Sequence, residues 1–396
     1  MAPEIDALRF VATADVYKAG VLAGHLTRTS TGSVVFAYRE GYGGEPVAFT
    51  LPTGQDQIEH PGGALPVFFS GLLPEGHRLT VLTRAAKTSL NDELTLLLAV
   101  GADVPGDVQV LPAGAPPQEP APMATADPGT LDFRALTDAP DRHALPGVQA
   151  KASATMLTTP LATAGRRAIL KIDRPEHPHL AANEALHLRA ARALKIPVAS
   201  AEIVRDRNGV PGLLVDRFDR ALDPSGTVTR LAMEDAGQVM GVLPAAKYTV
   251  DTEALISDVS ARASAPLVAV RNLYLQFVFA WLTGNGDLHA KNISVLRGDD
   301  GKWVVSPVYD VPSTLFYGDD TMALPVDGKI KRLRLRHWEA LAEAVGLPSR
   351  AAAGARTLAL KAAAAIDLSA LPFEGSPLNG TLRELRHRRY ELGRVS

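Results

Sequence analysis

Cysteine is absent from this chain of 396 residues. Its absence excludes disulfides, thiol nucleophiles and metal sites with cysteine ligands, and it is compatible with a reducing compartment. An excess of charge of one sign is missing too, because 41 Lys and Arg are balanced by 43 Asp and Glu. The whole protein therefore has no positive field that would hold nucleic acid by itself.

Long hydrophobic runs are also lacking. The most apolar stretch, residues 274–282, is too short for a membrane span and contains Gln276. No basic segment followed by an apolar one opens the chain, so we expect no signal peptide. With 46% hydrophobic and 21% charged residues, the composition is that of a globular protein. We expect a soluble, cytoplasmic protein without membrane contact, and the length indicates about two to three domains.

One segment divides the chain. Residues 112–130 consist mainly of Pro, Ala and Gly, which support neither helix nor strand and predict an exposed linker. Before it, β-prone runs around a Gly/Ser/Thr cluster at 29–33 predict a hairpin. The segments 68–86 and 89–100 each predict a helix.

After the linker, the pattern changes along the chain. Short β-prone runs extend to about residue 220 and enclose one helical pattern at 183–195. From about residue 234 onward helical patterns dominate, and short strands are expected near 293–296 and 303–308. The main helical patterns lie at 265–282, 331–345, 350–368 and 380–392. A β-rich half followed by a helical half indicates two lobes with a cleft between them.

The most informative motif is GNGDLHAKN at 284–292. Asp287 and Asn292 have the spacing of the base and the metal-binding Asn in a kinase catalytic loop. A carboxylate orients or deprotonates an attacking hydroxyl, and an amide oxygen just beyond it can bind magnesium on the phosphates. His289 is a candidate for positioning the loop, and a purely structural histidine is the open alternative.

A further carboxylate, Asp310, follows a β-prone run in the segment YDVPST at 309–314. A phosphotransferase needs a second metal-ligating carboxylate after its catalytic loop. Gly, Asn and Asp also form turns, so either segment alone is weak evidence. The two segments in this order favour the catalytic interpretation.

A phosphotransferase also needs a cation for the nucleotide phosphates. Lys171 lies in a β-prone run before the helical pattern that carries Glu184, a candidate ion-pair partner. An exposed strand lysine and an ordinary charge in the first turn of a helix are the alternatives. Upstream, LPGVQAKAS at 145–153 is a Gly-containing turn whose N–H groups can cradle phosphate, with Lys151 nearby.

The segment GLLVDRFDR at 212–220 joins the β-rich half to the helical half. In a two-lobed kinase this hinge contacts adenine, which makes Asp216 and Phe218 the nearest candidates. An edge strand followed by a salt-bridged turn is an equally good interpretation. The basic stretches 329–337 and 383–394 are typical of solvated helix faces.

These segments resemble a known family, the HipA serine/threonine kinase toxins of bacterial type II toxin–antitoxin modules. The resemblance spans nearly the whole chain, and its segments occur in family order. They are FFSGLLPEGHR at 68–78, GVQAK at 147–151, ILK at 169–171, NE at 183–184, DRFDR at 216–220, EDAGQVMG at 234–241, KY at 247–248, GNGDLHAKN at 284–292 and YDVPST at 309–314.

The resemblance implies an α+β protein with a two-lobed, protein-kinase-like fold and an extra N-terminal subdomain. The expected parts are a β-rich N-terminal subdomain at 1–111, the linker at 112–130, a β-rich kinase N-lobe at 131–220 and an all-α C-lobe at 221–396. ATP and Mg²⁺ are the implied cofactors. Asp287 becomes the expected base, with His289 and Lys291 beside it, and Asn292 and Asp310 become the magnesium ligands.

The resemblance also implies an ATP site. Its expected residues are Lys171, Glu184, Asp216, Phe218 and a phosphate turn of Gly147, Val148, Gln149 and Lys151. In the family, a Ser before this turn can be autophosphorylated, which switches the kinase off. Ala144 stands at that position, and Ser153 lies on the other side of the turn. We therefore predict no autophosphorylation within residues 145–153 and no inactivation by that route.

The implied partners are a small DNA-binding HipB antitoxin and a protein substrate, for which a glutamyl-tRNA synthetase is the first candidate. Operator DNA is expected to be bound only through the antitoxin complex, where the stretches 329–337 and 383–394 add phosphate contacts without base recognition. Two other functions stay open: a small-molecule phosphotransferase of the aminoglycoside or choline kinase type, and a catalytically idle co-repressor. FSGLLPEGHR and YDVPST do not belong to the first pattern, and the complete set of catalytic residues speaks against the second.

Overall fold

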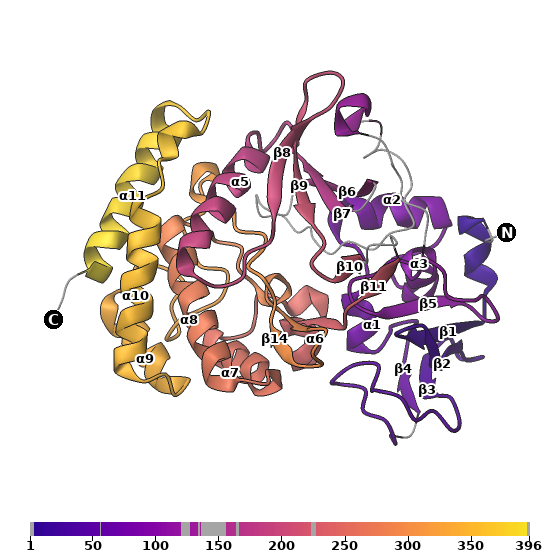
Figure 1. The fold of residues 1–396 in the computed structure, drawn as a ribbon. Helices are drawn as coiled ribbons and strands as arrows, with labels where there is room; N and C mark the ends of the chain where they lie inside the picture. Colours follow the sequence, from indigo (N-terminus) through magenta and orange to yellow (C-terminus); the bar gives the residue numbers. More distant parts are fainter. Residues whose placement is uncertain are drawn as a thin grey trace.

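The computed structural model describes residues 4–55, 57–119, 127–133, 135, 156–163, 166–222 and 227–393. The N-terminal elements lie at one end of the molecule and the last three helices at the other (Figure 1). A four-stranded sheet and a long buried helix lie between them. Among the described helices, none combines the length and apolarity needed to cross a bilayer.

The N-terminal part is built on an antiparallel five-stranded sheet with the order β4-β3-β2-β1-β5. Its strands are β1 (Thr13–Lys18), β2 (Val21–Arg28), β3 (Val34–Tyr38), β4 (Ile58–His60) and β5 (Val108–Pro112). The predicted hairpin is confirmed as β2 and β3, which pair across residues 29–33. The first β-prone run proves to be two strands, because Ala19 and Gly20 adopt positive φ and turn the chain back.

Three helices pack their buried side chains into the same core as this sheet: α1 (Val67–Gly71), α2 (Gly76–Ala86) and α3 (Glu93–Val100). The prediction of one continuous helix over 68–86 is wrong, because the chain leaves the helix at residues 72–75. Pro74 has no N–H to donate and disfavours helical backbone at Leu73, so a break at this place is expected in hindsight. The break positions Glu75 at the start of α2.

The predicted linker begins directly after β5. Its described residues 113–119 form no helix or strand, but Tyr17 on β1 donates a hydrogen bond to the carbonyl of Ala115, and Gln109 on β5 donates one to Gln118. A short 3₁₀ turn follows at Pro128–Thr130. The start of the linker is therefore attached to the N-terminal sheet.

The middle of the chain forms a four-stranded antiparallel sheet with the order β6-β7-β9-β8. Its strands are β6 (Leu157–Thr163), β7 (Arg166–Ile172), β8 (Ala201–Arg205) and β9 (Pro211–Asp216). The helix α5 (Leu180–Ala191) lies against β8 and β9, and its buried face joins the large core of the molecule. The helical pattern predicted at 183–195 is thereby confirmed, with a start three residues earlier.

The remaining helices are α6 (Ala236–Met240), α7 (Thr252–Arg262), α8 (Pro266–Thr283), α9 (Leu335–Ala344), α10 (Ser349–Ala364) and α11 (Gly375–Gly393). Every residue of α8 from Leu273 to Thr283 is buried, because α7, α10 and α11 pack around it. Residues 331–334 precede α9, so the basic stretch begins in a loop and not in a helix as predicted. The helix expected from 380 begins earlier, at Gly375.

The prediction of an all-α C-lobe is wrong. Residues 221–396 contain a three-stranded sheet of β12 (Met233–Asp235), β13 (Ser294–Arg297) and β14 (Trp303–Val305). A two-stranded pair, β10 (Arg220–Leu222) and β11 (Val228–Arg230), lies at the boundary. The chain leaves the loop at 284–292 in extended conformation as β13, whose buried backbone groups need partners that β12 and β14 supply.

Candidate active site

One pocket gathers most of the residues that the sequence singles out. It lies between β7 and β9, the loop after α8, the segment after β14 and the α1 end of the N-terminal part. Its polar lining includes Lys171, Asp216, Asp235, Gln238, Asp287, His289, Lys291, Asn292, Ser294 and Asp310, and its apolar lining includes Leu72, Pro105, Met156, Ile169, Val215, Phe218 and Met233. The N-terminal contribution of Gly71, Leu72 and Pro105 is not indicated by the sequence.

The loop that carries Asp287 begins where α8 ends. Gly284 has a φ of 71°, and a Cβ at this position would lie 2.3 Å from Leu315, so a side chain here is excluded on two grounds. The Asp287 N–H donates to Asn285 Oδ1 at 2.9 Å, and Asn292 Nδ2 donates to the Asp287 carbonyl at 2.9 Å. These bonds close the loop. Because the amide nitrogen of Asn292 donates within the loop, its amide oxygen is left to accept a bond or to bind a metal.

Two aromatic rings lie beside the carboxylate of Asp287, a residue that is only 1% exposed. Tyr248 donates a hydrogen bond of 2.6 Å to Oδ1, and burial and the charge of Asp287 raise the pKa of Tyr248 well above its ordinary value. Burial, followed by the charge of Lys247, lowers the pKa of His289 to about 3. The His289 ring is therefore neutral, and its Nδ1 accepts from the Lys291 N–H.

Lys171 lies between two carboxylates. Its ammonium is 2.8 Å from Glu184 Oε1, which is fully buried on α5, and 3.2 Å from Asp310 Oδ1. Burial opposes the charge of Lys171, but Asp310 and Glu184 outweigh it and raise the pKa of the ammonium above its ordinary value. The predicted ion pair of Lys171 and Glu184 is present. Together with Asp310 it connects β7, α5 and the segment after β14.

The backbone at Asp310 is unusual. Its φ is 54°, in the left-handed region that non-glycine residues rarely adopt. Asn183 on α5 holds the following segment with two hydrogen bonds to the backbone of Ser313, of 2.8 and 2.9 Å. Residues in such conformations persist where the surroundings impose them, and they gather at functional sites.

The donor set suits a magnesium ion that arrives on nucleotide phosphates. No group of three or more His, Asp or Glu side chains that could cage a metal occurs among the described residues. Magnesium at nucleotide sites uses one or two protein ligands, with waters and phosphate oxygens completing the coordination. Asn292 and Asp310 both line the pocket and offer one amide and one carboxylate group for this purpose.

The hinge residues are in the pocket as predicted, and their surroundings are charged. Asp216 forms an ion pair with Arg166, and the Phe218 ring lies 5.4 Å from that of Tyr309. The neighbouring Arg217 and Arg220 bind Asp103 of the N-terminal part at 2.8 and 2.9 Å. The hinge is thereby attached to residues more than a hundred positions earlier in the chain.

The same network contains Asp219, which pairs with Arg217 and Arg220 at 2.9 and 2.7 Å. Although burial acts in the opposite direction, these two arginines lower the pKa of Asp219 to about 2. The Gly106 N–H also donates to this carboxylate at 3.0 Å. The salt-bridged turn, one of the two interpretations of this segment, is thus present, and adenine contact by Asp216 and Phe218 stays a prediction.

Some predicted residues lie outside the described part of the chain. They are the phosphate turn Gly147, Val148, Gln149 and Lys151, together with Ala144 and Ser153. Their roles, and the absence of autophosphorylation in this turn, stay predictions.

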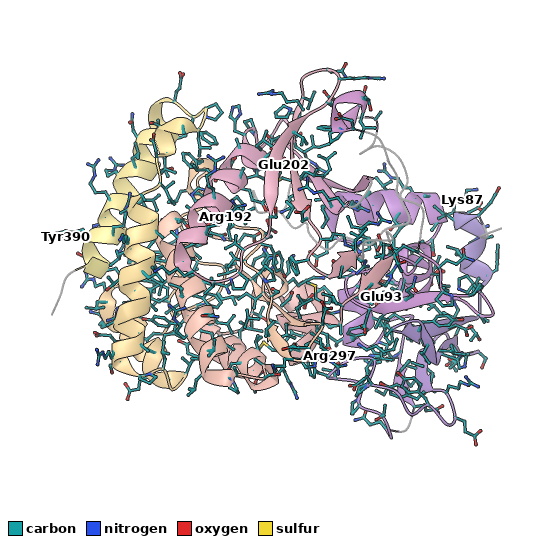
Figure 2. The ribbon with its side chains drawn as sticks, in the orientation of Figure 1. Lys87, Glu93, Arg192, Glu202, Arg297 and Tyr390 are labelled. Carbon is teal, nitrogen blue, oxygen red and sulfur yellow. The ribbon has the colours of Figure 1, made fainter. Side chains whose placement is uncertain are left out.

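Two arginines of the second basic stretch bind carbonyl groups of the protein and are not free for DNA phosphates. Arg388 is 2% exposed, its guanidinium lies 3.7 Å above the Trp281 ring, and it donates to the carbonyls of Trp281 and Asp320 at 3.1 and 2.7 Å. Arg389 donates to the carbonyls of Leu385 and Ala363. Figure 2 shows Tyr390, by contrast, on the outer side of α11. The hypothesis that Arg388 contacts DNA is therefore wrong, because its donors are committed to the core.

Family comparison identifies both halves of the chain. Residues 143–366 match the HipA-like C-terminal domain, and residues 14–111 match the HipA N-terminal domain. The chain belongs to the HipA family. In this HipA-family chain, the C-terminal match contains β7, the hinge, the loop at 284–292 and Asp310. The N-terminal match contains α1 and Asp103.

Relatives extend over nearly the whole length. The chain is 31% identical over 369 residues to "Putative kinase Y4mE" of Sinorhizobium fredii, covering 84% of this chain and 86% of the relative. It is 26% identical over 376 residues to the serine/threonine-protein kinase toxin HipA of Shewanella oneidensis, covering 87% and 82%.

A solved structure has the same fold. It comes from the Shewanella oneidensis MR-1 toxin–antitoxin complex of HipA, HipB and operator DNA. One chain of that complex aligns with a TM-score of 0.76 and 22% sequence identity, and the alignment covers 95% of this chain and 96% of that one. The expected HipA resemblance is confirmed, and so is a mixed α/β fold of the HipA type.

Proposed function

We propose that this protein is an ATP- and magnesium-dependent kinase that transfers the γ-phosphate of ATP to a hydroxyl group of a protein. The observation that carries this proposal is the convergence of Asp287, Asn292, Asp310 and Lys171 on one pocket from three separate stretches of chain. This combination is what positioning and charge stabilisation of a phosphoryl group require. The kinase names of two relatives support it.

Each side chain has a distinct part in this proposal. Asp287 accepts the proton of the acceptor hydroxyl, and Lys171, held by Glu184, contacts the nucleotide phosphates. Asn292 and Asp310 would hold Mg²⁺, which neutralises charge on the phosphates. The mostly apolar lining at Met156, Ile169 and Val215 fits an adenine, with the hinge at Asp216 and Phe218 beside it.

Transfer of label from γ-labelled ATP is the direct test. The purified chain is incubated with magnesium and either protein acceptors, beginning with glutamyl-tRNA synthetase, or aminoglycosides and choline. We expect label on a protein Ser or Thr and none with the Asp287→Asn variant, which retains ATP binding. Transfer only to the small molecules would replace the proposal with the small-molecule phosphotransferase, and bound ATP without any transfer would favour the idle co-repressor.

We further propose that a HipB-like helix-turn-helix antitoxin is the partner and that DNA is reached through that complex. The solved Shewanella structure contains HipA, HipB and operator DNA, which supports this assembly. On this chain the exposed cations Lys329, Arg332 and Arg336 are candidates for added phosphate contacts. Their joint replacement by Ala should lower the salt dependence of operator binding by the complex. An unchanged salt dependence would show that these side chains are solvated and do not contact DNA.

A further inference from the structure

Glu75 occupies an unexpected position for a residue of the N-terminal part. It is the N-cap residue of α2, yet its side chain makes no capping hydrogen bond to that helix. Its carboxylate instead forms a short ion pair with Lys247 and lies 3.1 Å from the ammonium of Lys291. Both lysines belong to the kinase part of the chain, 172 or more residues later.

The two lysines need this carboxylate. Their side chains are 1% and 4% exposed, and a buried ammonium is costly unless an opposite charge is close. Although burial acts in the opposite direction, Lys291 and Lys247 lower the pKa of Glu75 to about 2, so the carboxylate is ionised at neutral pH. Lys291 also donates to the carbonyl of Gly71 at 2.8 Å, which attaches the loop to the end of α1.

Both lysines are directly connected to the proposed catalytic groups. Lys291 immediately precedes Asn292, and its N–H donates to the His289 ring. The Lys247 carbonyl accepts from the Ala290 N–H at 3.3 Å, and the next residue, Tyr248, donates to Asp287. A displacement of Lys247 therefore moves Tyr248, which binds the proposed base Asp287. A displacement of Lys291 moves Asn292, the proposed metal ligand.

The approach of α1 to this region is close. Gln238 on α6 donates to the Phe68 carbonyl at 2.9 Å, and a Cβ on Gly71 would lie 2.8 Å from the Gln238 side chain. The absence of a side chain at position 71 leaves room for the Gln238 side chain beside the pocket. The N-terminal part is thus packed against α6, whose Gln238 lines the same pocket.

We propose that Glu75 is a positioning residue for phosphoryl transfer: by pairing with Lys247 and Lys291 it fixes the loop at 284–292, which makes the N-terminal subdomain part of the catalytic machinery. This inference rests on the proposed kinase function. Glu75 is not among the residues that line the pocket, and it is connected to the reacting groups through the two lysines.

The test is a steady-state comparison of Glu75→Gln with the full-length wild type, using ATP and a protein acceptor. Glutamine retains the shape but not the charge. We expect kcat to fall about 10- to 100-fold, the range for a small misplacement of catalytic groups, with KM for ATP within about twofold. Glu75→Asp retains the charge on a shorter arm and should recover part of the loss.

A matched control is Glu45→Gln. Glu45 also joins the N-terminal part to the kinase part, through an exposed ion pair of 3.6 Å with Arg297, which is labelled in Figure 2. Its replacement should leave kcat unchanged, because exposed pairs contribute little. Unchanged kcat in Glu75→Gln with an active wild type, or equal losses in both variants, would overturn the inference while leaving the kinase proposal intact.

A second readout does not depend on activity. Amide hydrogen exchange should become faster at residues 288–292 in Glu75→Gln and not in Glu45→Gln. If the wild type transfers no phosphate, the kinase proposal fails, and unchanged exchange at these residues would overturn the positioning of the loop as well. A kcat loss that disappears when both proteins are assayed well below their unfolding temperatures would show a merely structural effect and would also overturn it.

Discussion

The hydroxyl of Tyr248 donates a hydrogen bond of 2.6 Å to the Asp287 carboxylate. A protein hydroxyl thus occupies one face of the proposed base and restricts its rotation. The hydrogen bond to Asp287 is the contact through which Tyr248 would act on the proposed base.

Replacing Tyr248 by Phe therefore tests the orientation of the base. We expect kcat for phosphoryl transfer to fall about tenfold, the equivalent of one hydrogen bond to a charged group. KM for ATP should not change, because the ring and its packing against His289 remain. Equal kcat values for the variant and the wild type in initial-rate measurements would contradict this role.

Asp310 can be tested by nucleotide binding alone. Asp310→Ala removes a carboxylate from the proposed metal site and from Lys171, so Mg²⁺-dependent ATP binding should weaken about tenfold or more. Titration calorimetry with and without magnesium measures this difference. Asp287→Asn is the control and should bind like the wild type. A variant at 310 that keeps the full magnesium dependence would exclude Asp310 as a ligand.

Arg388 should matter for folding and not for DNA. Arg388→Ala leaves the carbonyls of Trp281 and Asp320 without these donors and removes a guanidinium stacked on an indole. We expect the free energy of unfolding to fall by about 3 kcal/mol. The exposed neighbour Arg386 should cost no more than about 0.5 kcal/mol when replaced by Ala. Chemical denaturation of both variants distinguishes the two cases.

Glu234 gives a stability that depends on pH. Burial raises its pKa to about 8, and its Oε1 accepts from the Phe49 N–H. Between about 4.5, the ordinary value, and about 8 the folded state holds a proton that the unfolded state has lost, so stability declines as pH rises, by at most about 1.4 kcal/mol per unit.

In the Glu234→Gln variant the side chain at this position does not titrate in either the folded or the unfolded state. The free energy of unfolding of the variant, relative to the wild type, should therefore increase steadily from pH 5 to pH 8. Urea denaturation at several pH values measures it. A constant difference across that range would show that Glu234 is ionised in the folded protein.

The sequence predicts the residues whose relationships are local or follow from chemical need. Asp287 and Asn292 lie in one loop, and their spacing, together with Asp310 farther along the chain, favours a catalytic loop. Lys171 and Glu184 are thirteen positions apart, and a strand followed by a helix brings them together. The hairpin of β2 and β3 and the buried helix α8 follow from turn residues and apolar content.

Contacts between distant segments are not predictable in this way. Nothing near Glu75 in the chain indicates that Lys247 and Lys291 are its partners, because the pairing depends on how two subdomains pack. Arg388 lies in a run of charges that is typical of a solvated helix face, and only its position over Trp281 explains its burial. The short strands expected near 293–296 and 303–308 are present as β13 and β14, but β12 is not indicated by the sequence, and its pairing with β13 is a tertiary effect.

The two carbonyls held by Arg388 have a consequence for protein synthesis. Trp281 belongs to the last turn of α8, directly before the catalytic loop, and every pocket residue precedes Arg388 in the chain. A ribosome that has completed residue 310 has made all the proposed catalytic groups, but the end of α8 still lacks the guanidinium that satisfies it. A chain interrupted by premature termination or cleaved before α11 therefore carries all the proposed catalytic residues but lacks the guanidinium that binds the carbonyl of Trp281 at the end of α8.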